Sequence, residues 1–153
     1  MYNTHRTYRI KVDFSKIATK YEEVALSKIQ KPAILIGLIT IRNNDDILDL
    51  GCGTGHLTRK LRELTNGRIV GVDPAEGMIK EAIEKNKDLD ITFEIKSAEE
   101  IEYKACFDVI FCNSAFQWFR DPQKALKIAT LLYVKVAELE SRHQRKGYIA
   151  LTL

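Results

Sequence analysis

Apolar residues along this chain follow two patterns, helical spacing and short continuous runs. Helical spacing predicts two successive helices over residues 15–40, separated near Pro32, and further helices over 56–65, 75–86 and 121–145. Short apolar runs predict strands over residues 47–50, 68–72, 91–95, 108–111 and 148–153. Strands that alternate with helices need crossover connections, which indicate a parallel sheet covered on both faces. The pattern therefore predicts an α/β fold with a doubly wound parallel sheet.

The organisation of the chain is that of one domain. Its 153 residues contain no repeat, linker or low-complexity tract, and a chain of this length buries enough surface to fold alone. We expect a single domain over residues 1–153, in which residues 1–40 form an N-terminal helical cover and residues 45–153 form the core.

Charge and cysteine usage narrow the possible partners. A net charge of +3 is only mildly basic, which makes a nucleic-acid partner unlikely. The longest apolar run, residues 33–41, is about half of a membrane span, and the polar N-terminus does not resemble a signal peptide. Three cysteines without metal-ligand spacing indicate free thiols and no metal site. We expect a cytoplasmic protein without a membrane partner.

A glycine-rich segment follows the first predicted strand and leads directly into a helix. Asp49 lies in the first predicted strand, and Gly51, Gly53 and Gly55 come at alternate positions after the strand. In doubly wound sheets ligands bind at the carboxyl ends of the strands. The glycines would let the backbone approach a ligand there, with free amides at the start of the helix facing it. A plain turn is the alternative interpretation.

The type of ligand depends on two residues. The dinucleotide fingerprint requires a glycine where this chain has His56. Asp49 would repel a pyrophosphate but could hold a cationic group such as an amino-acid ammonium. The segment therefore indicates a positively charged nucleoside ligand and disfavours a nicotinamide cofactor.

Asp73 follows the second predicted strand, twenty residues after Gly53. A carboxylate at that spacing can accept hydrogen bonds from both ribose hydroxyls. Alternatively, Asp73 and Pro74 start the next helix as its N-cap and first residue. The two roles can coexist.

The string ILDLGCGTGHLT, from Ile47 to Thr58, resembles the class I S-adenosylmethionine-dependent methyltransferases. The resemblance implies a Rossmann-like sheet that binds S-adenosylmethionine as its cofactor. It also implies where that cofactor lies, because the glycine-rich motif and the downstream acidic residue bind it in this family. The cofactor-binding residues implied by these two motifs are Asp49, Gly51, Cys52, Gly53, Asp73 and Pro74.

Two further segments extend the resemblance. VDPAEGMI resembles the second family motif, which implies that Met78 packs on the adenine, and FEIKSAEEI resembles the third, which places Ala98 and Glu99 beside the base. Ser97 stands where the family often has Asp. Its hydroxyl can still accept a hydrogen bond from the adenine amino group, but it lacks the negative charge of a carboxylate. A short helical turn at Ala98 and Glu99 is the alternative.

Two segments resemble one subgroup, the malonyl-acyl-carrier-protein O-methyltransferases of biotin synthesis and the related trans-aconitate methyltransferases. The string NSAFQW implies that Asn113, Ser114 and Gln117 lie at the cofactor. The spacing of Phe14, Ala18 and Tyr21 implies an N-terminal helix over the cofactor, with the Tyr21 hydroxyl toward the methionine moiety. Alternatively, these residues are the buried stripe of an amphipathic helix. We interpret Cys112 as a buried small hydrophobe.

The expected reaction needs no dedicated base. A carboxylate is already ionised at neutral pH, so methylation of a small or carrier-bound carboxylic acid requires only alignment and exclusion of water. No catalytic residue is therefore assigned, and the three histidines have ordinary structural explanations. The sequence predicts a methyltransferase, with a carboxylate compound as its second substrate.

The C-terminal region departs from the family. After the predicted strand at residues 148–153 the last two strands of the seven-stranded family sheet are lacking. An uncovered apolar strand edge favours association, so we expect a homodimer through this edge. The alternative to an enzyme is a non-catalytic S-adenosylmethionine-binding module, or a truncated domain that needs a partner chain. An RNA-binding enzyme is a weaker possibility, because basic residues at chain ends are usually solvated.

Overall fold

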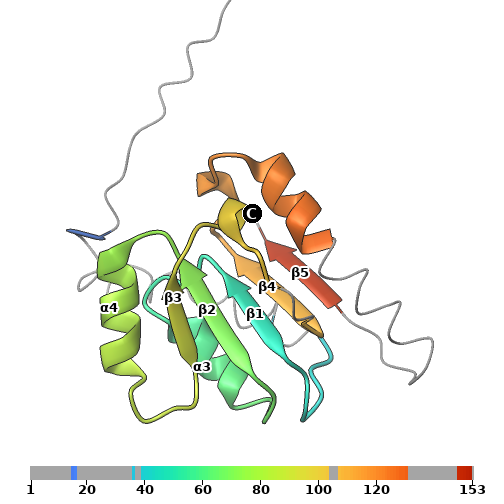
Figure 1. The fold of residues 1–153 in the computed structure, drawn as a ribbon. Helices are drawn as coiled ribbons and strands as arrows, with labels where there is room; N and C mark the ends of the chain where they lie inside the picture. The colour runs from blue at the N-terminus through green and yellow to red at the C-terminus, as the bar shows by residue number, and fades with distance from the viewer. Residues whose placement is uncertain (1–14, 17–35, 37–38, 104–106, 131–147, 153) are drawn as a thin grey trace, which may run out of the picture.

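A five-stranded parallel sheet is the centre of the computed structural model, which describes residues 15, 16, 36, 39–103, 107–130 and 148–152 (Figure 1). The strands follow the order β3-β2-β1-β4-β5, and each pairs in parallel with its neighbours. Their bounds are β1 Ile47–Leu50, β2 Ile69–Asp73, β3 Thr92–Ile95, β4 Val109–Asn113 and β5 Tyr148–Thr152. The order reverses between β1 and β4, which confirms the predicted doubly wound α/β fold.

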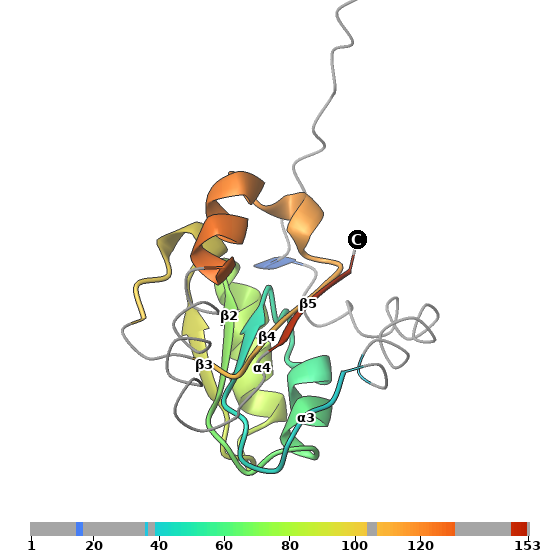
Figure 2. The same ribbon diagram turned by 90° about the vertical axis from the view of Figure 1, so that its right-hand side faces the viewer.

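Side chains of the central strands alternate between two buried clusters. Leu48 and Leu50 belong to the cluster that also contains Ala125 and Ala129, from the helical residues 122–130. Ile47 belongs to the other cluster, with Leu61 of the helix α3, His56–Arg62. Figure 2 shows these two helical segments on opposite sides of the sheet. The sheet is therefore buried on both faces, as continuous apolar strands require.

The remaining helical segments are short. The helix α4 spans Glu76–Lys85 and packs on β2 and β3, within one residue of the prediction at each end. Two 3-10 turns, η1 Ala98–Glu100 and η2 Phe116–Trp118, follow β3 and β4. The predicted helix 121–145 is helical over residues 122–130, with Pro122 in its first turn, and its remainder lies outside the described residues.

The helix α3 ends three residues earlier than predicted. Thr65, expected inside the helix, is 1% exposed, and its hydroxyl donates to the carbonyls of Asn43 (3.1 Å) and Asp45 (2.8 Å). Leu64, expected on the buried helix face, is 42% exposed. The side-chain bonds of Thr65 tie the chain to the segment before β1, which ends the helix at Arg62.

Few residues of the predicted N-terminal cover are described. Ile36, Ile39 and Ile41 pack against the cluster beneath α3. Ser15 lies at the start of α4, where its hydroxyl accepts a hydrogen bond from the Gly77 amide at 3.2 Å. The other residues of the predicted pair of helices, including Tyr21 and Pro32, lie outside the described residues.

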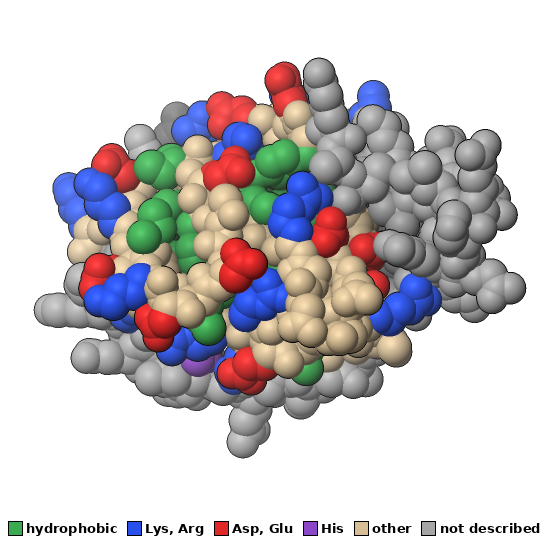
Figure 3. All heavy atoms as spheres, turned by 60° about the horizontal axis from the view of Figure 1, so that its bottom comes forward, with side chains coloured by type: hydrophobic (Ala, Val, Ile, Leu, Met, Phe, Trp, Pro, Cys, Tyr) green, Lys and Arg blue, Asp and Glu red, His purple; other side chains and the backbone are tan. Residues whose placement is uncertain are grey.

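The surface at the amino-terminal ends of the strands carries mixed charge. Figure 3 shows acidic and basic side chains interspersed over the described part of this face, with hydrophobic side chains between them. Within the described residues, no helix is both long enough and apolar enough to cross a membrane.

Candidate strand-end site

The predicted site residues that the structure describes gather at the carboxyl ends of β1, β2, β3 and β4. The glycine loop, residues 51–55, connects β1 to α3 and lies beside the end of β2. The amides of Gly51 and Cys52 both donate to the Val72 carbonyl, at 2.8 and 3.0 Å. These two bonds hold the loop at the point where the strand order reverses.

The amides of the glycine loop are used inside the protein. Gly53 donates to Asp73 Oδ2 at 3.1 Å, and Gly55 donates to the Cys52 carbonyl at 3.0 Å. The amides of Gly51, Cys52 and Gly53 are bonded because the Val72 carbonyl and the Asp73 carboxylate lie within their reach. The expectation of free amides concerned the start of α3, where the amide of the N-cap Gly55 is bonded within the loop. The four amides named above do not form the cradle that a pyrophosphate needs, which agrees with the prediction that disfavours a nicotinamide cofactor.

The three loop glycines differ in what surrounds them, although all have positive φ. A Cβ at Gly51 would lie 2.3 Å from the Ala115 Cβ, and one at Gly55 would lie 2.8 Å from the Phe93 ring. A Cβ at Gly53 would meet no atom within 4 Å. Gly51 and Gly55 therefore serve internal packing, and only Gly53 borders open space that a ligand could fill.

Asp73 connects the glycine loop to the start of α4. Its Oδ1 accepts from the Ala75 amide at 2.9 Å, while its Oδ2 accepts from Gly53. Burial raises the pKa of Asp73, and these two amide bonds oppose that shift. The N-cap of α4 is Ala75, so the alternative in which Asp73 and Pro74 are the N-cap and first residue of the helix is wrong by two residues. Its predicted role at the ribose fits the position of the carboxylate beside Gly53.

Asp49 is a buried carboxyl group on the α3 side of the sheet. It is 2% exposed, and its Oδ2 accepts a hydrogen bond from the Thr58 hydroxyl at 2.6 Å. Burial raises the pKa of Asp49 to about 7; the Thr58 bond opposes this shift and the charge of Asp73 adds to it. Sequence reasoning missed Thr58, although a threonine on the sheet-facing side of a helix was a signal that a buried partner exists.

Two thiols lie in the field of these carboxyl groups. Burial is the larger cause that raises the pKa of the Cys52 thiol, and the charge of Asp49 adds to it. The same two causes raise the pKa of the Cys112 thiol to about 12. Both cysteines are buried, which confirms Cys112 as a small core residue. The groups that surround Asp49 are thus acidic or neutral, a setting that favours a cationic ligand.

The segment after β3 forms the 3-10 turn η1. The Ser97 hydroxyl donates to Glu100 Oε2 at 2.8 Å, and Ser97 is the N-cap of the turn. Ala98 is buried, and Glu99 Oε1 accepts from the Asp121 amide at 3.0 Å. Although partial burial opposes it, this bond lowers the pKa of Glu99. The alternative interpretation of these residues as a short helical turn is confirmed.

The segment after β4 packs on the glycine loop. Asn113 is the last residue of β4, and Ser114 has a φ of 55°, a left-handed conformation that is strained for a residue with a side chain. The Ala115 that follows packs against Gly51, and Gln117 is exposed on η2. The strained turn thus brings residues 113–117 next to the loop after β1.

The other predicted positions are placed differently. Met78 is 2% exposed and belongs to the core in this structure, whereas Pro74 is exposed. Tyr21 lies outside the described residues. The described segments contain no group of three or more His, Cys, Asp or Glu side chains that could hold a metal ion.

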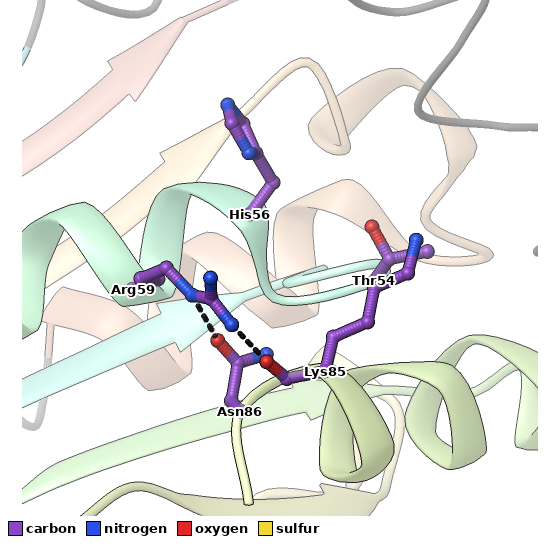
Figure 4. Close-up of a pocket in the computed structure, with 5 residues that line it drawn as sticks. All are labelled: Thr54, His56, Arg59, Lys85 and Asn86. Atoms are coloured by element: carbon purple, nitrogen blue, oxygen red, sulfur yellow. Dashed lines mark hydrogen bonds between the residues drawn. The ribbon is translucent and has the colours of Figure 1, made fainter. Parts of the chain in front are cut away.

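A separate pocket of about 220 Å³ lies between α3 and the end of α4 (Figure 4). It is lined by Thr54, His56, Arg59, Lys85 and Asn86. Arg59 Nε donates to Asn86 Oδ1 at 2.9 Å, and Arg59 Nη2 also donates to the Lys85 carbonyl. Lys85 pairs with Glu81, so the cations of this pocket already have protein partners. These contacts indicate that the pocket lies where α3 packs against the end of α4.

Comparison with known proteins shows the family to which the chain belongs. A family model described as a methyltransferase domain matches residues 41–152. The chain is 34% identical over 117 residues to a malonyl-[acyl-carrier protein] O-methyltransferase of Acetivibrio thermocellus, covering 73% of this chain and 41% of that protein. It is 33% identical over 114 residues to the enzyme of the same name from Anoxybacillus flavithermus, covering 74% of this chain and 44% of that protein. The chain thus spans about two-fifths of these curated relatives.

Solved methyltransferase structures have the same fold as this chain. A Haloferax volcanii methyltransferase, in complex with the Trm112 methyltransferase activator, matches with a TM-score of 0.70 and 21% identity, over 78% of this chain and 55% of that one. The plantazolicin methyltransferase BamL, in complex with a triazolic desmethylPZN analogue and S-adenosylhomocysteine, matches with a TM-score of 0.62 and 25% identity, over 77% of this chain and 47% of that one. These matches support the Rossmann-like methyltransferase fold and S-adenosylmethionine as the cofactor.

Proposed function

Because this chain belongs to the methyltransferase domain family, we propose that it transfers the methyl group of S-adenosylmethionine to a carboxylate of a small or carrier-bound acid. The cofactor follows from the family, and the acceptor class follows from the relatives that are named malonyl-[acyl-carrier protein] O-methyltransferases. Malonyl groups on an acyl carrier protein are therefore the first acceptor to test.

One observation carries the cofactor part of the proposal. Gly53 borders open space, and the Asp73 carboxylate is hydrogen-bonded to its amide at 3.1 Å. A nucleoside placed there would offer its ribose hydroxyls to Asp73, whose two oxygens each have a lone pair left after one amide bond. The cationic sulfonium and ammonium groups would lie near Asp49, in acidic surroundings that disfavour a pyrophosphate.

The other predicted residues take roles around the same nucleoside. We assign Met78, Ser97, Ala98 and Glu99 to the side of the base, and Gly51, Cys52 and Tyr21 to the methionine moiety. Asn113, Ser114 and Gln117 would close the site from β4, where the strained φ of Ser114 sets the direction of the turn. Pro74 would support Asp73 from the adjacent turn.

The reaction follows from these positions. A methyl group on a positively charged sulfur is supplied by the cofactor, and a carboxylate oxygen that attacks this carbon forms an ester bond as the carbon–sulfur bond breaks and the sulfur keeps the electron pair. Since the nucleophile is already ionised at neutral pH, the chain needs to align it and exclude water rather than deprotonate it. No side chain is required to act as a base.

Binding and turnover test the proposal separately. Isothermal titration calorimetry should show binding of S-adenosylmethionine and S-adenosylhomocysteine to the chain, with no binding of NAD as the control. Transfer of tritiated methyl from S-adenosylmethionine to malonyl-acyl carrier protein, with acetyl-acyl carrier protein as the matched acceptor without a free carboxylate, tests the reaction. Absence of binding by the folded chain would contradict the cofactor assignment.

A non-catalytic cofactor-binding module is the second candidate. It is supported by the Haloferax volcanii neighbour, which was solved in complex with a methyltransferase activator, so a protein partner of that kind would belong to this candidate. Cofactor binding without methyl transfer to any carboxylate would favour this candidate.

We also propose that two copies of the chain form a homodimer through β5. A cytoplasmic location is a separate proposal. Among the described strands β5 is at one edge of the sheet, paired on its other side with β4, so its backbone could pair with a second copy. The buried free thiols of Cys52 and Cys112 fit a reducing compartment. Light scattering coupled to size-exclusion chromatography should give twice the chain mass, and a monomer at all concentrations would contradict the dimer.

A further inference from the structure

Within the described residues, the Thr58 side chain lies outside the predicted site and donates a hydrogen bond to the Asp49 carboxyl group. Its hydroxyl donates to Asp49 Oδ2 at 2.6 Å, a short distance for this type of bond. Both residues are buried, with exposed fractions of 0% for Thr58 and 2% for Asp49. The bond joins the end of β1 to the first turns of α3 and thus spans the glycine loop.

The neighbours of Asp49 give its negative charge little other support. Among the described residues, Asp73 at the end of β2, Cys52 in the glycine loop and Cys112 in β4 are the groups coupled to it by charge, and each is acidic or neutral. On α3, the Arg59 guanidinium is directed to Asn86 and to the Lys85 carbonyl at the end of α4. Thr58 is therefore the neutral donor that partly offsets the burial of this carboxyl group.

We propose that Thr58 is a positioning residue for cofactor binding, whose hydroxyl fixes the orientation of the Asp49 carboxyl group and stabilises its charged form beside the cationic end of the cofactor. The inference rests on the proposed function, because it assumes a cationic ligand at the glycine loop. In consequence, binding of the cofactor is coupled to loss of a proton from Asp49.

The direction of the coupling follows from the charges. Without ligand, burial raises the pKa of Asp49 to about 7. A cation bound nearby favours the ionised carboxylate and lowers that pKa, so binding below neutral pH must release a proton. Affinity for S-adenosylmethionine should therefore rise with pH, by up to about tenfold per pH unit below 7, and become constant above it.

Substitution of Thr58 tests whether its hydroxyl controls this linkage. Thr58→Val keeps the shape of the side chain and removes the donor, whereas Thr58→Ser keeps the donor. Loss of one hydrogen bond to a charged group is worth about tenfold in an equilibrium constant. We expect Thr58→Val to bind S-adenosylmethionine about tenfold more weakly at pH 7, with its pH inflection shifted upward, and Thr58→Ser to restore both.

Calorimetry at several pH values, in buffers of different ionisation enthalpy, measures affinity and the protons released together. Carbon-13 NMR of the Asp49 carboxyl in the ligand-free wild-type protein measures its titration directly, and does not depend on whether Thr58→Val folds. Equal affinity and inflection in folded Thr58→Val, or a Thr58→Ser protein that behaves like Thr58→Val, would overturn the role of the hydroxyl.

Two further results separate this inference from the proposed function. Binding of S-adenosylmethionine by the wild-type protein without proton release at pH 6 would overturn the linkage while leaving the methyltransferase proposal intact. No binding of S-adenosylmethionine at any pH by the folded wild-type protein would overturn both.

Discussion

The glycine loop contains one glycine that borders open space and two that pack against the protein. A side chain at Gly51 would collide with Ala115, and one at Gly55 would collide with Phe93, while Gly53 borders open space. The sequence motif alone does not distinguish these cases, because all three glycines share the same positive φ region. The difference predicts different effects of the same substitution.

Gly51→Ala and Gly53→Ala should separate stability from binding. Both force an alanine into positive φ, at a cost of about 1–2 kcal/mol. Gly51→Ala adds the collision with Ala115 and should lose about 1–3 kcal/mol more, measured by urea unfolding. Gly53→Ala should lose less stability but bind S-adenosylmethionine more weakly, as calorimetry can measure. Equal stabilities of the two variants would contradict the packing role of Gly51.

Asp73→Ala should weaken cofactor binding. It removes the carboxylate proposed to accept the ribose hydroxyls and frees the amides of Gly53 and Ala75, which it now holds. The loss should be about 2–4 kcal/mol of binding free energy by calorimetry with S-adenosylmethionine. Asp88→Ala, an exposed acid after α4, is the matched control and should bind normally. Unchanged affinity in folded Asp73→Ala would refute the ribose role.

Elements with a clear apolar pattern were predictable from the sequence. The strands β1, β2 and β4 lie in the interior of the sheet and have four successive buried residues each, so their runs were unmistakable and their predicted bounds differ by two residues at most. The parallel order followed from the intervening helices. The strand-end location of Asp49, the glycines and Asp73 followed from that order.

What the sequence did not reveal depends on contacts between elements. The end of α3 is determined by the bonds of Thr65 to the segment before β1, which no local pattern encodes. The bonds of the Gly51 and Cys52 amides to the Val72 carbonyl were not predictable, because that carbonyl comes from another strand. The partner of Asp49 was missed for the same reason, since Thr58 lies on the next helix.

Asn86→Ala should weaken the junction between α3 and α4. The Asn86 side chain is 3% exposed, donates to the Ala82 carbonyl at 2.7 Å and accepts from Arg59 Nε at 2.9 Å. Removing it leaves buried groups without partners, which should reduce the free energy of unfolding by about 1–3 kcal/mol in urea. Asn66→Ala removes an exposed amide bond to Asn43 and should cost less than about 1 kcal/mol. Equal losses would contradict this role of Asn86.

At the scale of the whole molecule, the buried Asp49 makes folding stability depend on pH. The folded state raises the pKa of this carboxyl from 3.8 to about 7, so between these values it holds a proton that the unfolded chain has released. The extra proton stabilises the folded state. This stabilisation is complete below the pKa that Asp49 has in the unfolded chain, and it is lost as pH rises through the folded-state pKa of about 7. The pKa of Asp73 is raised in the same direction by burial.

Asp49→Asn should remove this dependence, because the amide has the shape of the neutral acid and can still accept from Thr58. The stability of the variant relative to wild type should increase by about 2 kcal/mol between pH 5 and pH 8. Urea unfolding at several pH values, without cofactor, measures this difference. A difference that stays constant over this range would contradict the perturbed titration.

The contact between Gly51 and Ala115 has a genetic consequence. The two residues occupy one shared volume, although they belong to turns after different strands. Ala115→Gly should therefore act as a suppressor of Gly51→Ala, restoring most of the stability lost to the collision, and should have no such effect on Gly53→Ala. Among natural variants of this chain, the residue sizes at these two positions should accordingly vary in opposite directions.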